Sequence, residues 1–106
     1  GLDIAAPEGT NVYAPLDGLV LFSEEFFYRG NIVYIDHGNG LISSFSHLQK
    51  SLVKKNKKVK TGDLIGKVGK TGRVTGPHLH WEVSILGTTV DPKLFLKTIN
   101  NSLDNL

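Results

Sequence analysis

The sequence contains no cysteine and no methionine. The absence of cysteine excludes disulfide scaffolds, cysteine nucleophiles, zinc fingers and iron–sulfur sites. Any metal bound by these residues must therefore be held by His, Asp or Glu side chains. A chain without these two residue types also fits an oxidising envelope or secreted setting, in a fold that does without disulfides.

Long apolar runs are also absent. No stretch reaches the roughly 18 apolar residues of a membrane-spanning helix, so we expect no membrane-spanning segment in this chain. The 106 residues, 40% hydrophobic and 21% charged, have the length and balance of one globular domain rather than of a disordered tail. Twelve glycines indicate many tight turns, which favours an all-β fold over a helical bundle.

Arginine is scarce, with only Arg29 and Arg73, and the lysines have no aromatic residues interleaved, so nucleic-acid binding is not expected. Half of the basic residues are lysines of the acid-free segment 50–60: Lys50, Lys54, Lys55, Lys57, Lys58 and Lys60. We interpret this lysine cluster as a solvated loop. The alternative is a weak attraction to an anionic polymer, which salt would screen.

Short β-prone segments separated by turn residues run along most of the chain. The expected strands are residues 11–14, 19–23, 31–37, 41–47, 59–69 (interrupted by a turn) and 78–85. Asp91-Pro92 is typical of a helix start, and Phe95, Ile99 and Leu103 follow at helical spacing. We therefore predict a short C-terminal helix and no second domain.

The segment 78–85 alternates without interruption, so it is predicted to be a strand with two different faces. One face carries His78, His80, Glu82 and Ser84, and the other carries Leu79, Trp81, Val83 and Ile85. The two imidazoles lie about 6.5 Å apart by strand rise, close enough to serve one site. The alternative is an exposed polar face with two ordinary histidines.

Three further residues are candidates for the same site. His47 ends the segment 41–47, where Phe45 is predicted to share its face. Asp3 lies beside an apolar run, where an acid is either a cap or the partner of a cation. His37, before Gly38, is interpreted as a turn residue. A His/His/Asp metal site is compatible with this spacing, which leaves open whether His78, His80 or both would bind the metal.

Many separated motifs together resemble the lysostaphin/LytM-type zinc endopeptidases, in unbroken order over roughly residues 1–96. These motifs are Gly1-Leu2-Asp3-Ile4-Ala5-Ala6-Pro7, Asp17-Gly18, His37-Gly38-Asn39-Gly40, Ser46-His47-Leu48, Thr61-Gly62-Asp63 and Thr75-Gly76-Pro77-His78-Leu79-His80-Trp81-Glu82-Val83. The resemblance implies a compact antiparallel β-sandwich or hybrid barrel with an open groove. It also implies hydrolysis of cross-bridges or stem peptides of bacterial peptidoglycan, in the periplasm or outside the cell.

Carried over by position, the resemblance assigns zinc ligation to Asp3 and His80, and non-ligand catalytic roles to His47 and His78. The family's first histidine ligand falls two positions before Gly1. We therefore expect weak or no zinc binding by residues 1–106 alone and full binding when an upstream histidine is present. The resemblance implies a peptidase domain truncated at its N-terminus over 1–98, a helix end and tail over 99–106, and an upstream regulatory or anchoring segment.

Zinc in such a site would lower the pKa of a water toward about 7. No carboxylate base like that of HExxH enzymes is visible, so we expect His47 and His78 jointly to orient or deprotonate water and to stabilise charge. The loops 26–30 and 70–77 are expected to form the walls of the groove.

Two other functions compete with this interpretation. One is a catalytically inactive LytM-type domain that binds cell wall or activates another hydrolase, which is disfavoured because every family position within the chain is filled. The other is a lipoyl- or biotinyl-like carrier, suggested by residues 59–65. That function needs a lysine at a hairpin tip between matched strands, and none is evident.

Overall fold

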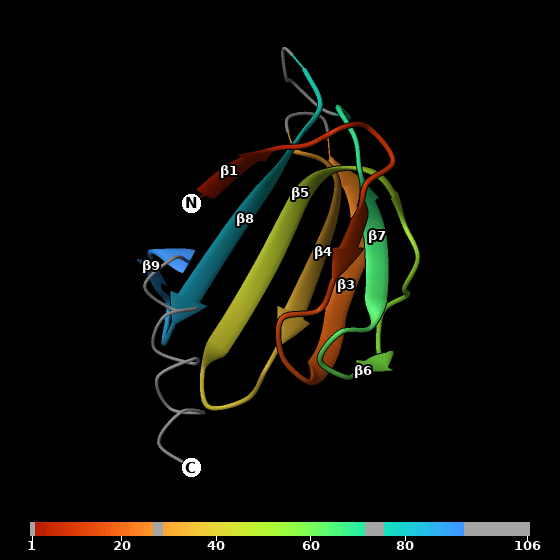
Figure 1. Ribbon diagram of the computed structural model, residues 1–106. Coiled ribbons are helices and arrows are strands. Elements are labelled where there is room, and N and C mark those ends of the chain that lie inside the picture. The colour runs from red at the N-terminus through yellow and green to blue at the C-terminus, as the bar shows by residue number, and fades with distance from the viewer. Residues whose placement is uncertain (1, 27–28, 72–75, 93–106) are drawn as a thin grey trace.

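The computed structural model describes residues 2–26, 29–71 and 76–92, and strands account for most of them (Figure 1). The all-β prediction is confirmed. The strands are β1 Leu2–Ala5, β2 Asn11–Tyr13, β3 Gly18–Phe26, β4 Gly30–Asp36, β5 Leu41–Ser51, β6 Lys58–Val59, β7 Leu64–Val68, β8 His78–Ile85 and β9 Thr88–Val90.

Every strand pair is antiparallel, and the main order across the sheet is β1-β8-β5-β4-β3-β6. β7 pairs with both β5 and β2, and β9 pairs with β8. Figure 1 shows the long strands β8, β5, β4 and β3 side by side, with β7 lying over β3. The sheet is therefore curled into a half-barrel, in agreement with the hybrid-barrel prediction.

The concave side of the sheet holds the apolar core. Leu79, Trp81 and Val83 of β8 are buried there, and Trp81 stacks on Phe45 of β5 with ring centroids 6.0 Å apart. The predicted alternation of β8 is thus confirmed for these three residues. Ile85 differs, since it is 43% exposed at the last position of the strand, beyond the core.

The turn between β4 and β5 is also as expected. The backbone N–H of His37 donates to the carbonyl of Leu41, which closes the hairpin. The His37 ring contacts the carbonyl oxygen of Asp17 through Nδ1 and Oγ of Ser43 through Nε2, each at 2.8 Å. His37 therefore links this turn to the segment just before β3, and its role is structural.

Two other expectations concern the periphery. The lysine cluster is exposed throughout, which confirms that it is solvated, but it is not all loop, since Lys50 lies in β5 and Lys58 in β6. Pro92 is buried, and the predicted helix after it falls in 93–106, outside the described residues. Within the part of the chain that the structure describes, no helix has the length and hydropathy needed to cross a membrane.

Candidate active site

Three histidines from two adjacent strands converge on one face of the sheet. The ring of His47 on β5 lies 5.0 Å from that of His78 and 6.3 Å from that of His80, centroid to centroid. The strands are held in register here, because Ser46 pairs directly with His80. The sequence predicted that His78 and His80 share a face, and the strand pairing brings His47 to it.

His47 reaches this face through a β-bulge. The β4–β5 register runs from Val33 opposite Phe45 to Asn31 opposite Leu48, so β5 contains one extra residue. His47 has a left-handed φ of 63°, a conformation that costs a non-glycine residue on the order of 1–3 kcal/mol and is concentrated at functional sites. The prediction that Phe45 and His47 share a face is therefore wrong, because the bulge interrupts the alternation and Phe45 packs on Trp81 in the core.

Two loop residues hold the bulge in place. The backbone N–H of His47 donates to the carbonyl of Arg29 at 2.8 Å. The hydroxyl of Thr71 donates to the carbonyl of Leu48 at 2.6 Å and accepts from the backbone N–H of Asn31 at 3.0 Å. Arg29 and Thr71 are described parts of the loops predicted to form the groove walls, whereas 27–28 and 72–75 lie outside the described residues.

Backbone carbonyls set the tautomers of His47 and His78. Nδ1 of His47 lies 2.8 Å from the carbonyl oxygen of Thr71, and Nδ1 of His78 lies 3.0 Å from that of Gly76. A carbonyl oxygen can only accept, so Nδ1 carries the proton in each ring. In its neutral form each imidazole then has its basic lone pair on Nε2.

His80 has the opposite arrangement. Its Nε2 lies 2.8 Å from Oε1 of Glu82. The hydrogen bond from His80 and, to a smaller degree, the positive charge of Arg29 hold the pKa of Glu82 below its ordinary value, although partial burial opposes them. An ionised carboxylate can only accept, so the proton is on Nε2 and the lone pair of neutral His80 is on Nδ1.

Glu82 was assigned to this face by the sequence but was given no role. Its other oxygen, Oε2, lies 3.3 Å from Nη2 of Arg29, and Nη1 of Arg29 donates to the Tyr34 hydroxyl at 2.8 Å. The two-residue spacing from His80 was the available signal. The pairing with Arg29 is a contact between β8 and a distant loop, which strand periodicity does not predict.

The backbone register brings Asp3 near the same histidines. β1 pairs with β8 so that Asp3 is opposite His80. On the other side of His80, Oγ of Ser46 is buried without a hydrogen-bond partner among the described residues. Such an orphaned polar atom is expected where a bound group or a water belongs. Imidazole and carboxylate donors suit zinc, so the residues present fit this metal.

The described side chains alone do not complete a metal site. Among them, no three His, Asp or Glu side chains are grouped closely enough to hold an ion. His47 and His78 lie near His80 with their lone pairs on Nε2, whereas that of His80 is on Nδ1. The structure therefore distinguishes His47 and His78, with the lone pair on Nε2, from His80, with the lone pair on Nδ1. The sequence spacing could not make this distinction.

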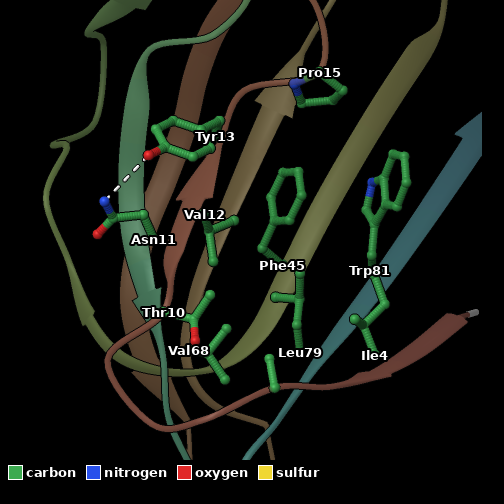
Figure 2. Close-up of a pocket in the computed structure, with 11 residues that line it drawn as sticks. Ile4, Thr10, Asn11, Val12, Tyr13, Pro15, Phe45, Val68, Leu79 and Trp81 are labelled. Carbon is green, nitrogen blue, oxygen red and sulfur yellow. Dashed lines mark hydrogen bonds between the residues drawn. The ribbon is translucent and has the colours of Figure 1, made fainter.

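A cavity of about 340 Å³ lies away from this chemistry. Figure 2 shows it in the concave side of the sheet, lined mainly by apolar side chains that include Phe45, Leu79 and Trp81. At its edge the side-chain amide of Asn11 donates to the hydroxyl of Tyr13 at 3.1 Å. Leu79 and Trp81 of β8 line this cavity and the histidines alternate with them, so the cavity belongs to the core face of the sheet.

A much smaller hollow, about 50 Å³, lies beside Glu82. Its lining residues are Tyr34, Ile42, Ser44, Glu82 and Ser84. Glu82 and Ser84 share the face of β8 that carries His80. The surface next to the histidines is therefore polar and slightly hollowed.

Known proteins are similar to this chain in sequence and in fold. The sequence profile of peptidase family M23 matches residues 1–92. The peptidoglycan DD-endopeptidase ShyA of Vibrio cholerae is 50% identical over 91 residues, which are 86% of this chain and 21% of that protein. The chain therefore spans about a fifth of the length of that relative.

Two solved structures extend the comparison. A zinc-containing peptidase from Vibrio cholerae superposes with a TM-score of 0.84 at 44% identity, over 86% of this chain and 28% of that one. The catalytic domain of lysostaphin from Staphylococcus simulans superposes with a TM-score of 0.84 at 34% identity, over 92% and 77%. The resemblance inferred from the motifs is confirmed.

Proposed function

The chain belongs to peptidase family M23, and from this premise we propose that it is a zinc-dependent endopeptidase acting on cross-bridges or stem peptides of bacterial peptidoglycan. The observation that carries the proposal is the convergence of His47, His78 and His80, with Asp3 opposite His80 in the strand register. The name of ShyA supports the substrate, and the zinc-containing neighbour supports the metal. A peptidoglycan substrate implies a location in the cell envelope, in the periplasm or outside the cell.

Asp3 and His80 are the proposed zinc ligands within this chain. Catalytic zinc usually has three protein ligands, and the resemblance assigns the third to a histidine two positions before Gly1. When bound, zinc supplies Lewis acidity, which lowers the pKa of water toward about 7 and polarises a peptide carbonyl. The lone pair on Nδ1 of His80 follows from the hydrogen bond that its Nε2 makes with Glu82.

His47 and His78 act on the reacting groups. Each ring is oriented by a carbonyl on Nδ1, so Nε2 is the nitrogen that takes a proton from water. Once protonated, the same Nε2–H donates to the oxyanion that forms at the attacked carbonyl or to the leaving amine. The 5.0 Å between the two rings allows both to contact one small group.

The direct experiment uses the full-length protein with purified cross-linked peptidoglycan. With zinc bound, we expect cross-linked muropeptide dimers to be converted to monomers, as read by mass spectrometry. Removal of the metal with a chelator should stop the reaction, and added zinc should restore it. Intact dimers in the presence of stoichiometric zinc would contradict the proposal.

That contrary result would favour the inactive LytM-type domain that binds wall or activates another hydrolase. Co-sedimentation with insoluble peptidoglycan, without release of peptides, would then identify a binding module. Against this alternative, all four positions that the resemblance assigns, Asp3, His47, His78 and His80, are occupied by the expected residue types.

A further inference from the structure

Both carboxylate oxygens of Glu82 have a partner, one in a hydrogen bond and one in an ion pair. Oε1 accepts from Nε2 of His80 at 2.8 Å, and Oε2 faces Nη2 of Arg29 at 3.3 Å. The side chains of His80 and Glu82 are 25% and 32% exposed, so the carboxylate is partly buried. It is therefore positioned between the imidazole and the guanidinium.

Arg29 is itself held at several points. Its Nη1 donates to the hydroxyl of Tyr34 at 2.8 Å, and the Tyr34 ring stacks on Phe22 at a centroid distance of 4.5 Å. Its backbone carbonyl accepts from the N–H of His47 at 2.8 Å. Arg29 thus contacts Tyr34 of β4, the backbone of His47 and the carboxylate of Glu82. These contacts fix the direction in which Glu82 points.

An isolated surface ion pair contributes little to stability and would be the simplest explanation of Arg29 and Glu82. That explanation does not account for Oε1 of Glu82, which accepts the hydrogen bond from His80. A carboxylate that accepts from one imidazole nitrogen fixes the tautomer, orients the ring and makes the other nitrogen more basic. All three effects act on Nδ1 of His80.

We propose that Glu82, held by Arg29, is a positioning residue that keeps His80 in its Nε2–H tautomer and strengthens metal binding through Nδ1. The inference rests on the proposed function, in which His80 is a zinc ligand. Loss of such a partner typically weakens metal affinity by about 10- to 100-fold. Glu82 does not contact substrate in this account.

The tautomer can be tested without metal. Long-range ¹H–¹⁵N correlation spectra of the full-length, metal-free protein, labelled at histidine, report which nitrogen of His80 carries the proton. We expect the Nε2–H form in the wild type, and a mixture or the Nδ1–H form in Glu82→Ala. An Nδ1–H form in the wild type, or an unchanged Nε2–H form in Glu82→Ala, would overturn the proposal.

Zinc affinity provides a second readout, measured by competition with a chromophoric chelator. Glu82→Ala should weaken binding by about 10- to 100-fold. Glu82→Gln should weaken it less, because the amide oxygen still accepts from Nε2. Glu24→Ala is the matched control, since Glu24 is an exposed carboxylate on β3, and its affinity should equal that of the wild type.

Wild-type zinc affinity in Glu82→Ala would overturn the role of Glu82 and leave the proposed function intact. Failure of the wild type to bind zinc at all would instead overturn the proposed function. If Glu82→Ala does not fold, as judged by its thermal transition, Arg29→Lys replaces it. That variant keeps the positive charge but loses the planar fork, so its zinc affinity should fall and its thermal transition should persist.

Discussion

His78 and His80 lie two residues apart on the same face of β8, yet they are held in opposite ways. His78 donates from Nδ1 to a loop carbonyl, that of Gly76, as His47 donates to the carbonyl of Thr71. His80 donates from Nε2 to the carboxylate of Glu82. Identical side chains at equivalent strand positions therefore present different nitrogens, because their hydrogen-bond partners differ.

The difference matches the division of labour that we propose. The neutral carbonyl orients His47 and His78 without adding a charge, which suits rings that gain and lose a proton during turnover. The ionised carboxylate beside His80 suits a ring that stays on a cation. Of the following four predictions, ordered from the largest expected effect to the smallest, the first three test this comparison and the fourth tests a contact outside the histidine cluster.

His80→Ala should have the largest effect. Removal of one of the three proposed ligands should reduce zinc occupancy to near zero at micromolar zinc and peptidoglycan cleavage to background, because the two that remain cannot complete the site. Elemental analysis of the full-length protein after dialysis measures the first effect. His37→Ala, a histidine outside the cluster, should keep its zinc, and a zinc content near one equivalent in His80→Ala would contradict the assignment.

His78→Ala and His47→Ala should reduce turnover by on the order of 10²-fold or more, as for loss of a general base or an oxyanion donor. Zinc content should stay near one equivalent in both. The measurement is the initial rate of muropeptide release at saturating peptidoglycan, together with metal analysis of the same sample. Loss of zinc from either variant would show that the substituted histidine is a ligand. That histidine would then not differ in role from His80.

Gly30→Ala should disturb His47 and leave zinc affinity unchanged. Gly30 has φ of 67°, and an added Cβ would overlap Thr71, whose carbonyl holds His47. We expect a loss of about 1–3 kcal/mol in the free energy of unfolding, together with reduced turnover. Urea denaturation measures the first effect.

Gly9→Ala is the matched control for Gly30→Ala. Gly9 also has a left-handed φ, of 92°, but an added Cβ there would meet nothing within 4 Å. The Gly9→Ala variant should lose less free energy of unfolding than Gly30→Ala and should keep the wild-type turnover. If the two substitutions reduced turnover equally, the contact of Gly30 with Thr71 would not explain the effect, and the role of Thr71 in holding His47 would be contradicted.

Asp17→Asn should have the smallest effect and none on turnover. Hydrogen bonds from the backbone N–H and hydroxyl of Thr61 hold the pKa of Asp17 below its ordinary value. Its contribution to stability is therefore complete above the unfolded pKa and is lost as pH falls through the lower, folded pKa. The urea midpoint of the wild type should exceed that of Asp17→Asn at pH 6, and the difference should narrow below about pH 4. A constant difference would contradict this role.

The sequence predicted the parts of the site that depend on local patterns. Alternation in β8 put His78 and His80 on one face, and the motif order indicated the family. The position of His47 was not predictable from period 2, because a bulge depends on pairing with β4 and on loop contacts from Arg29 and Thr71. The role of Glu82 required the same long-range information, since Arg29 is distant in sequence.

The most direct test of the account is a crystal structure of the zinc-loaded, full-length protein, with anomalous scattering measured at the zinc absorption edge. We expect one zinc peak bonded to a carboxylate oxygen of Asp3 and to Nδ1 of His80, the latter at about 2.0 Å. His47 and His78 should lie beyond bonding distance, with Nε2 directed toward the metal-facing side of the site. A zinc peak bonded to His47 or His78 in place of His80 would contradict the central claim.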